Sequence, residues 1–167
     1  AVNVGMDNPV IEDFVTGFVQ GATDYNPEVK VVKGTVGSWT DPAKMKELCL
    51  SQARDQKADV FYQVAGGSGA GLFEACKELG TWAIGVDSDQ SVLAPENIIT
   101  SALKRVDNAS YDIAKAVLED TYKSGVTVYD LSSSGVDYVA SDLLTDDVKK
   151  AVEDVKAKIL SGEIVVP

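Results

Sequence analysis

The chain has 167 residues, 45% of them hydrophobic, which is enough for one globular domain with an apolar core. Its formal net charge of −11 makes nucleic acid and anionic membrane surfaces unfavourable partners. The sequence contains no histidine, which excludes a histidine general base and a zinc site with histidine ligands. We therefore expect a single globular domain that does not bind nucleic acid.

The first half of the chain alternates short apolar runs with amphipathic stretches. Residues 2–6 predict a strand, and Asn8 is a good N-cap for a helix whose first turn begins with proline. Residues 29–36 alternate between apolar and polar side chains and predict a second strand. Asp41 is also followed by proline and is expected to begin the next helix.

Residues 58–90 form the segment around which the rest of the chain is organised. The run at 60–64 suits a buried strand, glycines within 66–69 break it, and a helical stripe leads to a second strand at 82–86. In a parallel βαβ unit both strands end at the same edge of the sheet. The glycine turn and Asp87 should therefore lie side by side, at the edge where open α/β sheets bind ligands.

The second half continues this alternation and then changes. Residues 98–103 predict a strand, a helix begins at Val106, and residues 126–129 predict another strand. Strands separated by helices favour an α/β fold with an open, mostly parallel sheet of five to six strands and helices on both faces. The tail at 131–167 contains an amphipathic helix, and we expect its apolar face to need a partner that this chain does not encode.

The glycine turn admits three interpretations. A phosphate-binding loop would use N–H groups at the helix start, but the Gly-Lys-Ser/Thr ending that reaches phosphate and magnesium is absent here. The glycine spacing also differs from the GxGxxG pattern of dinucleotide-binding proteins. Two other interpretations stay open. The turn packs the helix tightly against the strand, or Gly66 and Gly67 form a site for a neutral polar ligand.

Charged side chains extend the same edge. We expect Asp87 to accept hydrogen bonds from paired sugar hydroxyls, because one carboxylate takes both at once. Lys104 ends the next strand and would donate to the same hydroxyls, and Asp7 follows the first strand. A solvated acidic loop is the alternative. A metal ion would need more oxygen ligands than Asp7, Asp87 and Asp89 provide.

The aromatic residues and the two carboxylates are compatible with two classes of function, a binding protein and an enzyme. Tyr62 is either a core residue or a ring that stacks on a planar base at this edge, and Trp39 is a weaker aromatic candidate. Asp87 and Asp89 could serve a nucleoside hydrolase as its two carboxylates. Ser68 has no histidine to activate it, and we favour a binding protein over an enzyme.

Several motifs carry a resemblance to a known family. They are FYQVAGGSGAGLFEACKELGTWAIGVDSDQSVLAP at 61–95, SALKRVD at 101–107, GMDNPVIEDFVTGFVQGA near the start, TVGSWTDPAKMKELCLSQ, and the closing SGEIVVP. In this order they resemble the BMP (basic membrane protein, PnrA-like) family. Its members are substrate-binding lipoproteins of ABC transporters that capture purine nucleosides. The resemblance covers nearly the whole chain.

The resemblance implies a fold of two α/β lobes of periplasmic-binding type with the ligand between them. Residues 1–130 resemble the carboxyl-terminal, ligand-binding lobe, and residues 131–167 resemble a crossover tail whose helix would pack on an amino-terminal lobe that this chain lacks. Asp87 would hold the ribose hydroxyls with help from Lys104, and Tyr62 would stack on the base. The implied ligand-binding residues are Met6, Asp7, Tyr62, Gly66, Gly67, Asp87 and Lys104.

The resemblance also implies a biological role without catalysis, metal or cofactor. The chain would supply one wall of a cleft that binds a purine nucleoside or similar small molecule. The expected partners are an ABC permease and either the amino-terminal lobe or a second copy of the chain as a dimer. The expected location is extracytoplasmic, as a periplasmic or cell-surface lipoprotein. Because half a cleft leaves one face of the ligand in water, we expect weak binding by this chain alone.

Overall fold

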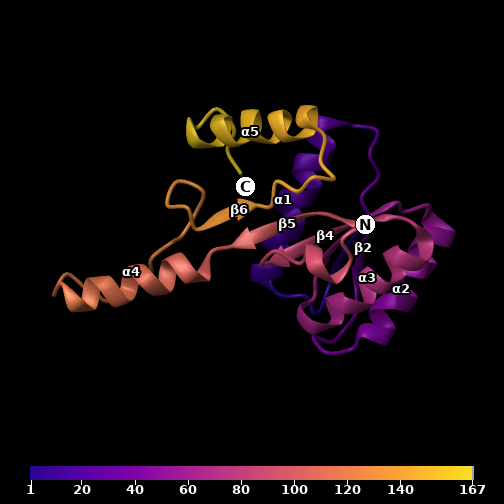
Figure 1. Ribbon diagram of the computed structural model, residues 1–167, viewed down its shortest axis with the longest axis horizontal. Helices are drawn as coiled ribbons and strands as arrows, with labels where there is room; N and C mark the ends of the chain where they lie inside the picture. Colours follow the sequence, from indigo (N-terminus) through magenta and orange to yellow (C-terminus); the bar gives the residue numbers. More distant parts are fainter. Residues whose placement is uncertain (167) are drawn as a thin grey trace.

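The computed structural model describes residues 1–166 and has an open α/β fold (Figure 1). Within this range the chain forms one six-stranded sheet in the order β2-β1-β3-β4-β5-β6. The strands are β1 (Val2–Val4), β2 (Lys33–Thr35), β3 (Val60–Val64), β4 (Trp82–Asp87), β5 (Ile98–Lys104) and β6 (Val136–Tyr138). All neighbours are parallel except β6, which is antiparallel to β5. The predicted open, mostly parallel sheet is confirmed.

Helices cover both faces of this sheet. On one face α2 (Pro42–Gln56) and α3 (Gly69–Leu79) enclose a core that includes Phe61 of β3. On the other face α1 (Pro9–Tyr25) packs on a second core that includes Tyr62. Successive residues of a strand point to opposite faces, so β3 supplies one aromatic ring to each core.

The predicted caps set the start of the first two helices. The Asn8 side chain accepts a hydrogen bond from the N–H of Ile11 at 3.2 Å, and Asp41 accepts one from Lys44 at 3.0 Å. Each cap is followed by proline at the first helical position, where the missing N–H costs nothing. Both helices therefore begin just after a strand ends, which keeps the loops at the carboxyl edge short.

The sequence-based prediction of two strands needs correction. Residues 126–129 are loop rather than strand, and Val126 and Val128 are 96% and 76% exposed. Their β-branched side chains favour a strand, but a strand also needs a free neighbour, and β6 already occupies the outer edge of β5. The predicted strand at 29–36 contracts to β2 at the opposite edge of the sheet.

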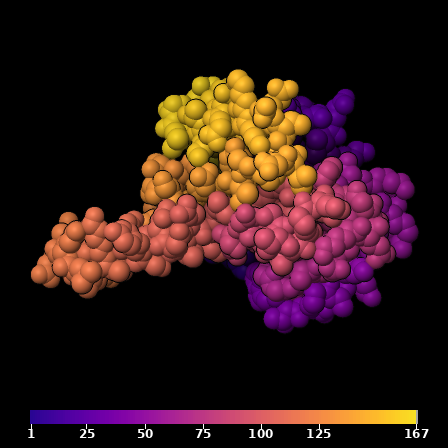
Figure 2. Space-filling view, in the orientation of Figure 1, coloured from indigo at the N-terminus to yellow at the C-terminus, as the bar shows by residue number. Residues whose placement is uncertain are grey.

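The described part of the tail, residues 131–166, contributes a strand and a helix. Its strand β6 joins this sheet, and α5 (Asp146–Leu160) lies over β6 (Figures 1 and 2). Tyr138 of β6 donates a hydrogen bond to Glu153 at 3.0 Å, and Lys156 lies 3.0 Å from Asp137. None of the α5 side chains is buried, so the expectation that its apolar face packs on a separate lobe stays a prediction.

Helix α4 (Val106–Leu118) is the element that leaves the body. It follows β5 directly and projects beyond the end of that strand as an isolated arm (Figures 1 and 2). Each of its residues is at least partly exposed, including the apolar side chains of Val106, Tyr111, Ile113, Val117 and Leu118. The division of the chain at residue 130, with the tail helix packing on a second lobe, stays a proposal.

Candidate functional site

The loops that follow β1, β2 and β3 are joined by backbone hydrogen bonds at the carboxyl edge. Gly37 N–H donates to the carbonyl of Gly5 at 2.8 Å, and Gly5 N–H donates to Val64 at 3.0 Å. Ser68 N–H donates to the carbonyl of Trp39 at 3.0 Å. Three separated parts of the sequence thus form one continuous platform at the edge where α/β sheets bind ligands.

Asp87 and Lys104 form an ion pair beside this platform. They end the neighbouring parallel strands β4 and β5, and the Lys104 Nζ lies 2.7 Å from the Asp87 Oδ1. Both side chains are 50% exposed, so a ligand can reach the carboxylate and the ammonium together. The pair offers hydrogen-bond acceptors and donors side by side, which suits vicinal hydroxyl groups.

Asp89 has a separate, local role. Its Oδ1 accepts a hydrogen bond from the N–H of Ser91 at 2.9 Å, at the start of the short turn η2 (Ser91–Leu93). This bond holds the pKa of Asp89 below its ordinary value. A glycosidase requires a carboxyl group with a raised pKa as its general acid, and Asp89 is shifted in the opposite direction.

The glycine turn forms a short 3₁₀ turn, η1 (Gly66–Ser68), that leads into α3. Gly66 has a φ of +55°, a conformation that favours glycine. Ser68 is buried, donates through its hydroxyl to Ser38 at 2.9 Å and accepts from Asp41 N–H at 2.8 Å. Since the N–H groups of Ser68 and Gly69 also have partners inside the protein, the turn resembles a packing device more than a phosphate cradle.

Tyr62 does not lie where a base could stack on it. Its ring is 5% exposed, and its centroid lies 5.2 Å from that of Phe18, within the core under α1. Burial raises the pKa of the Tyr62 hydroxyl, and the charge of Asp87 raises it further. The core alternative that the sequence left open describes this residue, because it is buried and its ring packs against Phe18.

Trp39 is the aromatic residue that lies on the platform. It is 37% exposed, and a Cβ on Gly5 would overlap its ring. A Cβ on Gly66 would lie 3.6 Å from the same ring. The indole therefore rests against the glycines that end β1 and β3. These glycines are the sequence signal that would have favoured Trp39 over Tyr62.

Asp7 and Met6 lie on the far flank of the platform. Met6 is 46% exposed. The Asp7 carboxylate is bound by β2, with Lys33 Nζ at 2.7 Å and the Thr35 hydroxyl at 3.2 Å. The hydrogen bond from Lys33 holds the pKa of Asp7 below its ordinary value. Asp7 thus belongs to the predicted edge, but its carboxylate is engaged with β2 rather than with Asp87.

Over residues 1–167 the chain matches the sequence model of the family described as "ABC transporter substrate-binding protein PnrA-like". The chain belongs to this PnrA-like family. The resemblance predicted from the motifs at the glycine turn and at Asp87 is therefore confirmed.

Relatives of this PnrA-like chain include a nucleoside-binding protein and a basic membrane protein. It is 34% identical over 181 residues to the ABC transporter nucleoside-binding protein BmpA of Lactococcus lactis, covering 98% of this chain and 51% of that protein. It is 33% identical over 162 residues to Basic membrane protein C of Borreliella burgdorferi, covering 94% of this chain and 46% of the relative. The chain thus spans about half the length of these curated relatives.

A solved structure has the same fold. An ABC transporter solute-binding protein from Aeropyrum pernix K1 superimposes with a TM-score of 0.86 at 30% sequence identity, covering all of this chain and 57% of that protein. The fold of this PnrA-like chain therefore matches just over half of that solute-binding protein.

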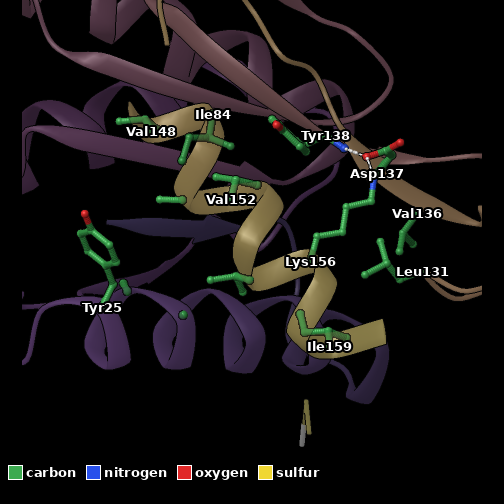
Figure 3. A pocket seen from close by; sticks show the side chains of 14 residues that line it. Tyr25, Ile84, Leu131, Val136, Asp137, Tyr138, Val148, Val152, Lys156 and Ile159 are labelled. Atoms are coloured by element: carbon green, nitrogen blue, oxygen red, sulfur yellow. Dashed lines mark hydrogen bonds and ion pairs between the residues drawn. The ribbon is translucent and has the colours of Figure 1, made fainter. Parts of the chain in front are cut away.

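An apolar cavity lies apart from the platform, between α1, the sheet and α5 (Figure 3). Its volume is about 660 Å³, and valine, alanine, isoleucine and tyrosine side chains dominate its lining. Its charged residues, Asp137 and Lys156, already pair with each other. The cavity lacks the free polar groups that would orient a nucleoside, so we do not assign the ligand site there.

Other kinds of site find no support within residues 1–166. No cluster of three or more histidine, cysteine, aspartate or glutamate side chains in this described range could hold a metal ion. No helix in the same range is long and apolar enough to cross a membrane. Cys49 and Cys76 are buried free thiols, and burial raises their pKa values to about 12 and about 11.

Proposed function

We propose that this chain is the ligand-binding lobe of an ABC transporter substrate-binding protein, and that the ligand is a purine nucleoside or a similar small molecule. The single observation that carries the proposal is the half-exposed Asp87–Lys104 pair at the carboxyl edge, 2.7 Å apart. Nothing in the sheet itself requires an ion pair there. Its position fits the general location of ligands in open α/β folds.

The sugar is the part of the ligand that this pair would recognise. The Asp87 carboxylate would accept hydrogen bonds from two vicinal ribose hydroxyls, and Lys104 would donate one to a hydroxyl oxygen. Hydrogen bonds to charged groups are roughly twice as strong as those between neutral groups. The printed name of the relative from Lactococcus lactis, a nucleoside-binding protein, supports a ligand that carries a ribose.

The base would lie on the aromatic residue of the platform. Trp39 takes the stacking role that the sequence had suggested for Tyr62, because Trp39 is partly exposed and Tyr62 is buried. Gly66 and Gly67 lack side chains, so the ligand can approach the backbone beside the indole. Met6 would contribute an apolar contact from the end of β1.

The other wall of the cleft would come from an amino-terminal lobe, as the coverage of about half of each relative suggests. Helix α4 starts at the edge that holds Lys104 and projects past it with apolar side chains exposed (Figure 1). A lobe docked on α4 would face the platform. In this proposal the complete protein is an extracytoplasmic lipoprotein that delivers its ligand to an ABC permease.

An enzyme is the weaker candidate. The nucleoside hydrolase hypothesis needs Asp87 and Asp89 on opposite sides of a glycosidic bond, with one carboxyl group protonated. Asp89 instead accepts a hydrogen bond from Ser91 N–H at the start of η2 and has a lowered pKa. The Ser68 hydroxyl is engaged with Ser38 and Asp41 of the loop after β2, which leaves it no role as a nucleophile.

Nuclear magnetic resonance (NMR) titration of the ¹⁵N-labelled chain tests the proposal. Adenosine, guanosine and inosine would be added up to millimolar concentrations, since a single wall is expected to bind weakly. We expect shift changes at the Trp39 indole and at the amides of Gly66, Gly67, Asp87 and Lys104, with none around the α1–α5 cavity. 2′-Deoxyinosine is the matched control, and it should bind less tightly because it lacks one ribose hydroxyl.

Four results would contradict parts of this proposal. The absence of any shift with all three nucleosides would refute nucleoside binding. Shifts confined to the cavity would move the site away from Asp87. Submicromolar affinity of this chain alone would show that one wall is sufficient. Release of free base during the titration would favour the hydrolase.

A further inference from the structure

The backbone at Asp87 has a conformation that is rare for residues other than glycine. Its φ is +68°, and the N–H of Ser88 donates to the carbonyl of Val86 at 2.8 Å. This three-residue hydrogen bond around a residue with positive φ is a γ-turn, which is strained for an L-amino acid. Such strain persists only where the surroundings hold the turn in place.

The side chain of Gln90 holds this turn from within the protein. Its Oε1 accepts a hydrogen bond from Val86 N–H at 2.9 Å, immediately before Asp87. The same oxygen accepts from Gln63 Nε2 at 2.8 Å. The backbone N–H of Gln90 in turn donates to the Ser101 hydroxyl on β5 at 3.2 Å. Gln90 therefore ties the turn to both neighbouring strands.

Gln63 connects this arrangement to the glycine turn. It is fully buried on β3, and its Oε1 accepts from the N–H of Ala65 at 3.1 Å, directly before Gly66. The two glutamine amides thus form one chain of hydrogen bonds from the backbone at Ala65 to the backbone at Val86. Gln63 is buried and Gln90 is partly buried, where hydrogen bonds are stronger than in water, so the two amides fix the groups that they join.

Two glycines provide the space for these amides. A Cβ on Gly69 would overlap the Gln63 side chain. A Cβ on Gly85 would lie 2.8 Å from Gln90 Oε1 and would overlap the Ser101 hydroxyl. The hydrogen-bond chain therefore depends on small residues on α3 and β4, and it is part of how the carboxyl edge is built.

We propose that Gln90 is a positioning residue for ligand binding. It holds the γ-turn that aims the Asp87 carboxylate beside Lys104, and through Gln63 it fixes this carboxylate relative to the glycine turn. The inference rests on the proposed function, since Asp87 is taken as the group that binds the ribose. Gln90 itself need not touch the ligand.

The test compares three variants of the 167-residue chain. Gln90→Met removes the acceptor and nearly keeps the side-chain volume, whereas Gln90→Glu keeps an acceptor oxygen and serves as the conservative rescue. Gln52→Met is the matched control, because it breaks another buried amide pair, with Asn3 at 2.8 and 2.9 Å, away from the turn. The readouts are hydrogen exchange of the Val86 amide and the dissociation constant for inosine.

In Gln90→Met we expect Val86 exchange to become about tenfold faster and inosine affinity to fall about fivefold to tenfold, because the hydrogen bonds from Val86 N–H and Gln63 Nε2 are both lost. Gln90→Glu should restore both, and Gln52→Met should lower the unfolding temperature but change neither. Unchanged Val86 exchange in Gln90→Met, or an equal loss of affinity in Gln52→Met, would overturn the proposal. If the wild-type chain binds no nucleoside, the proposed function fails, while the Val86 measurement still decides whether Gln90 holds the turn.

Asp87→Gly tests the strain directly. Glycine adopts the positive φ without penalty, so we expect the unfolding temperature to rise by about 2 °C while inosine binding is lost. An unchanged or lower unfolding temperature would overturn the account of a strained turn. The separation of stability from binding distinguishes a positioning device from an ordinary structural contact.

Discussion

The Lys104 ammonium lies 2.7 Å from the Asp87 carboxylate across the ends of two neighbouring parallel strands. Both side chains are half exposed, and exposed pairs contribute only about 0–1 kcal/mol to folding. The contact is therefore a poor explanation for stability. It is better explained as a pair of donor and acceptor groups that a ligand with vicinal hydroxyls would use.

Neutralising either member of this pair should affect binding far more than folding. We expect Asp87→Asn to weaken inosine binding about 10-fold to 100-fold, the range for a lost hydrogen bond to a charged group. Lys104→Met should weaken it about 10-fold. Affinity is measured by NMR titration and stability by urea unfolding. Lys77→Met breaks a comparable surface pair with Glu74, at 2.8 Å on α3, and should leave affinity unchanged.

A methyl group at Gly5 should displace the Trp39 indole. A Cβ at this position would overlap the ring, so Gly5→Ala is expected to shift the Trp39 emission and to weaken binding of the base about 10-fold, within the range for lost aromatic stacking. The measurement uses a Trp82→Phe background, which leaves Trp39 as the only tryptophan. Gly17→Ala is the matched control, because a Cβ at Gly17 meets nothing within 4 Å. Equal emission and affinity in both variants would exclude Trp39 from the site.

The sequence predicted the part of the site that topology determines. In a parallel sheet every strand ends at the same edge, so Asp87, Lys104 and the glycine turn could be placed together without coordinates. The period of two along β3 explains why Phe61 and Tyr62 point to opposite faces. It could not show that α1 would seal the face of Tyr62 with Phe18, which is a tertiary contact.

The positions of the last two helices could not be predicted for a related reason. Both α4 and α5 have an amphipathic pattern, and such a pattern shows that a helix needs an apolar partner but does not identify that partner. The antiparallel pairing of β6 with β5 determines where α5 lies, since the chain returns over the sheet after β6. The strand β6 is only Val136–Tyr138, too short for its periodicity to reveal the pairing.

The two thiols should become reactive only when the protein unfolds. Burial raises the pKa of Cys49 to about 12 and that of Cys76 to about 11, against an ordinary value of 9.0. A raised pKa favours the protonated folded state, so this contribution to stability is complete below pH 9.0 and is lost as the pH rises toward 11 and 12. We expect the free energy of unfolding to fall in this window, measured by urea unfolding at stepped pH.

Labelling with iodoacetamide at pH 8 gives the matching kinetic test of the thiols. The native chain should stay unmodified while the chain in urea takes up two labels, one for each cysteine in the sequence. Cys49→Ala should remove the larger share of the pH dependence, because the pKa of Cys49 is raised further than that of Cys76. Rapid labelling of the native chain would show that the core around α2 and α3 is open to solvent.

The exposed apolar side of α4 should make this chain associate with itself when no second lobe covers it. Val106, Ile113 and Val117 recur at helical spacing and are 59%, 43% and 56% exposed. We expect dimers in sedimentation velocity at high protein concentration, and Ile113→Lys should shift them to monomers by placing a charge within the apolar stripe. Asp112→Asn changes the net charge by the same +1 on another side of α4 and should leave the dimer intact. A wild-type chain that stays monomeric, or equal dissociation in both variants, would show that α4 is not the associating surface.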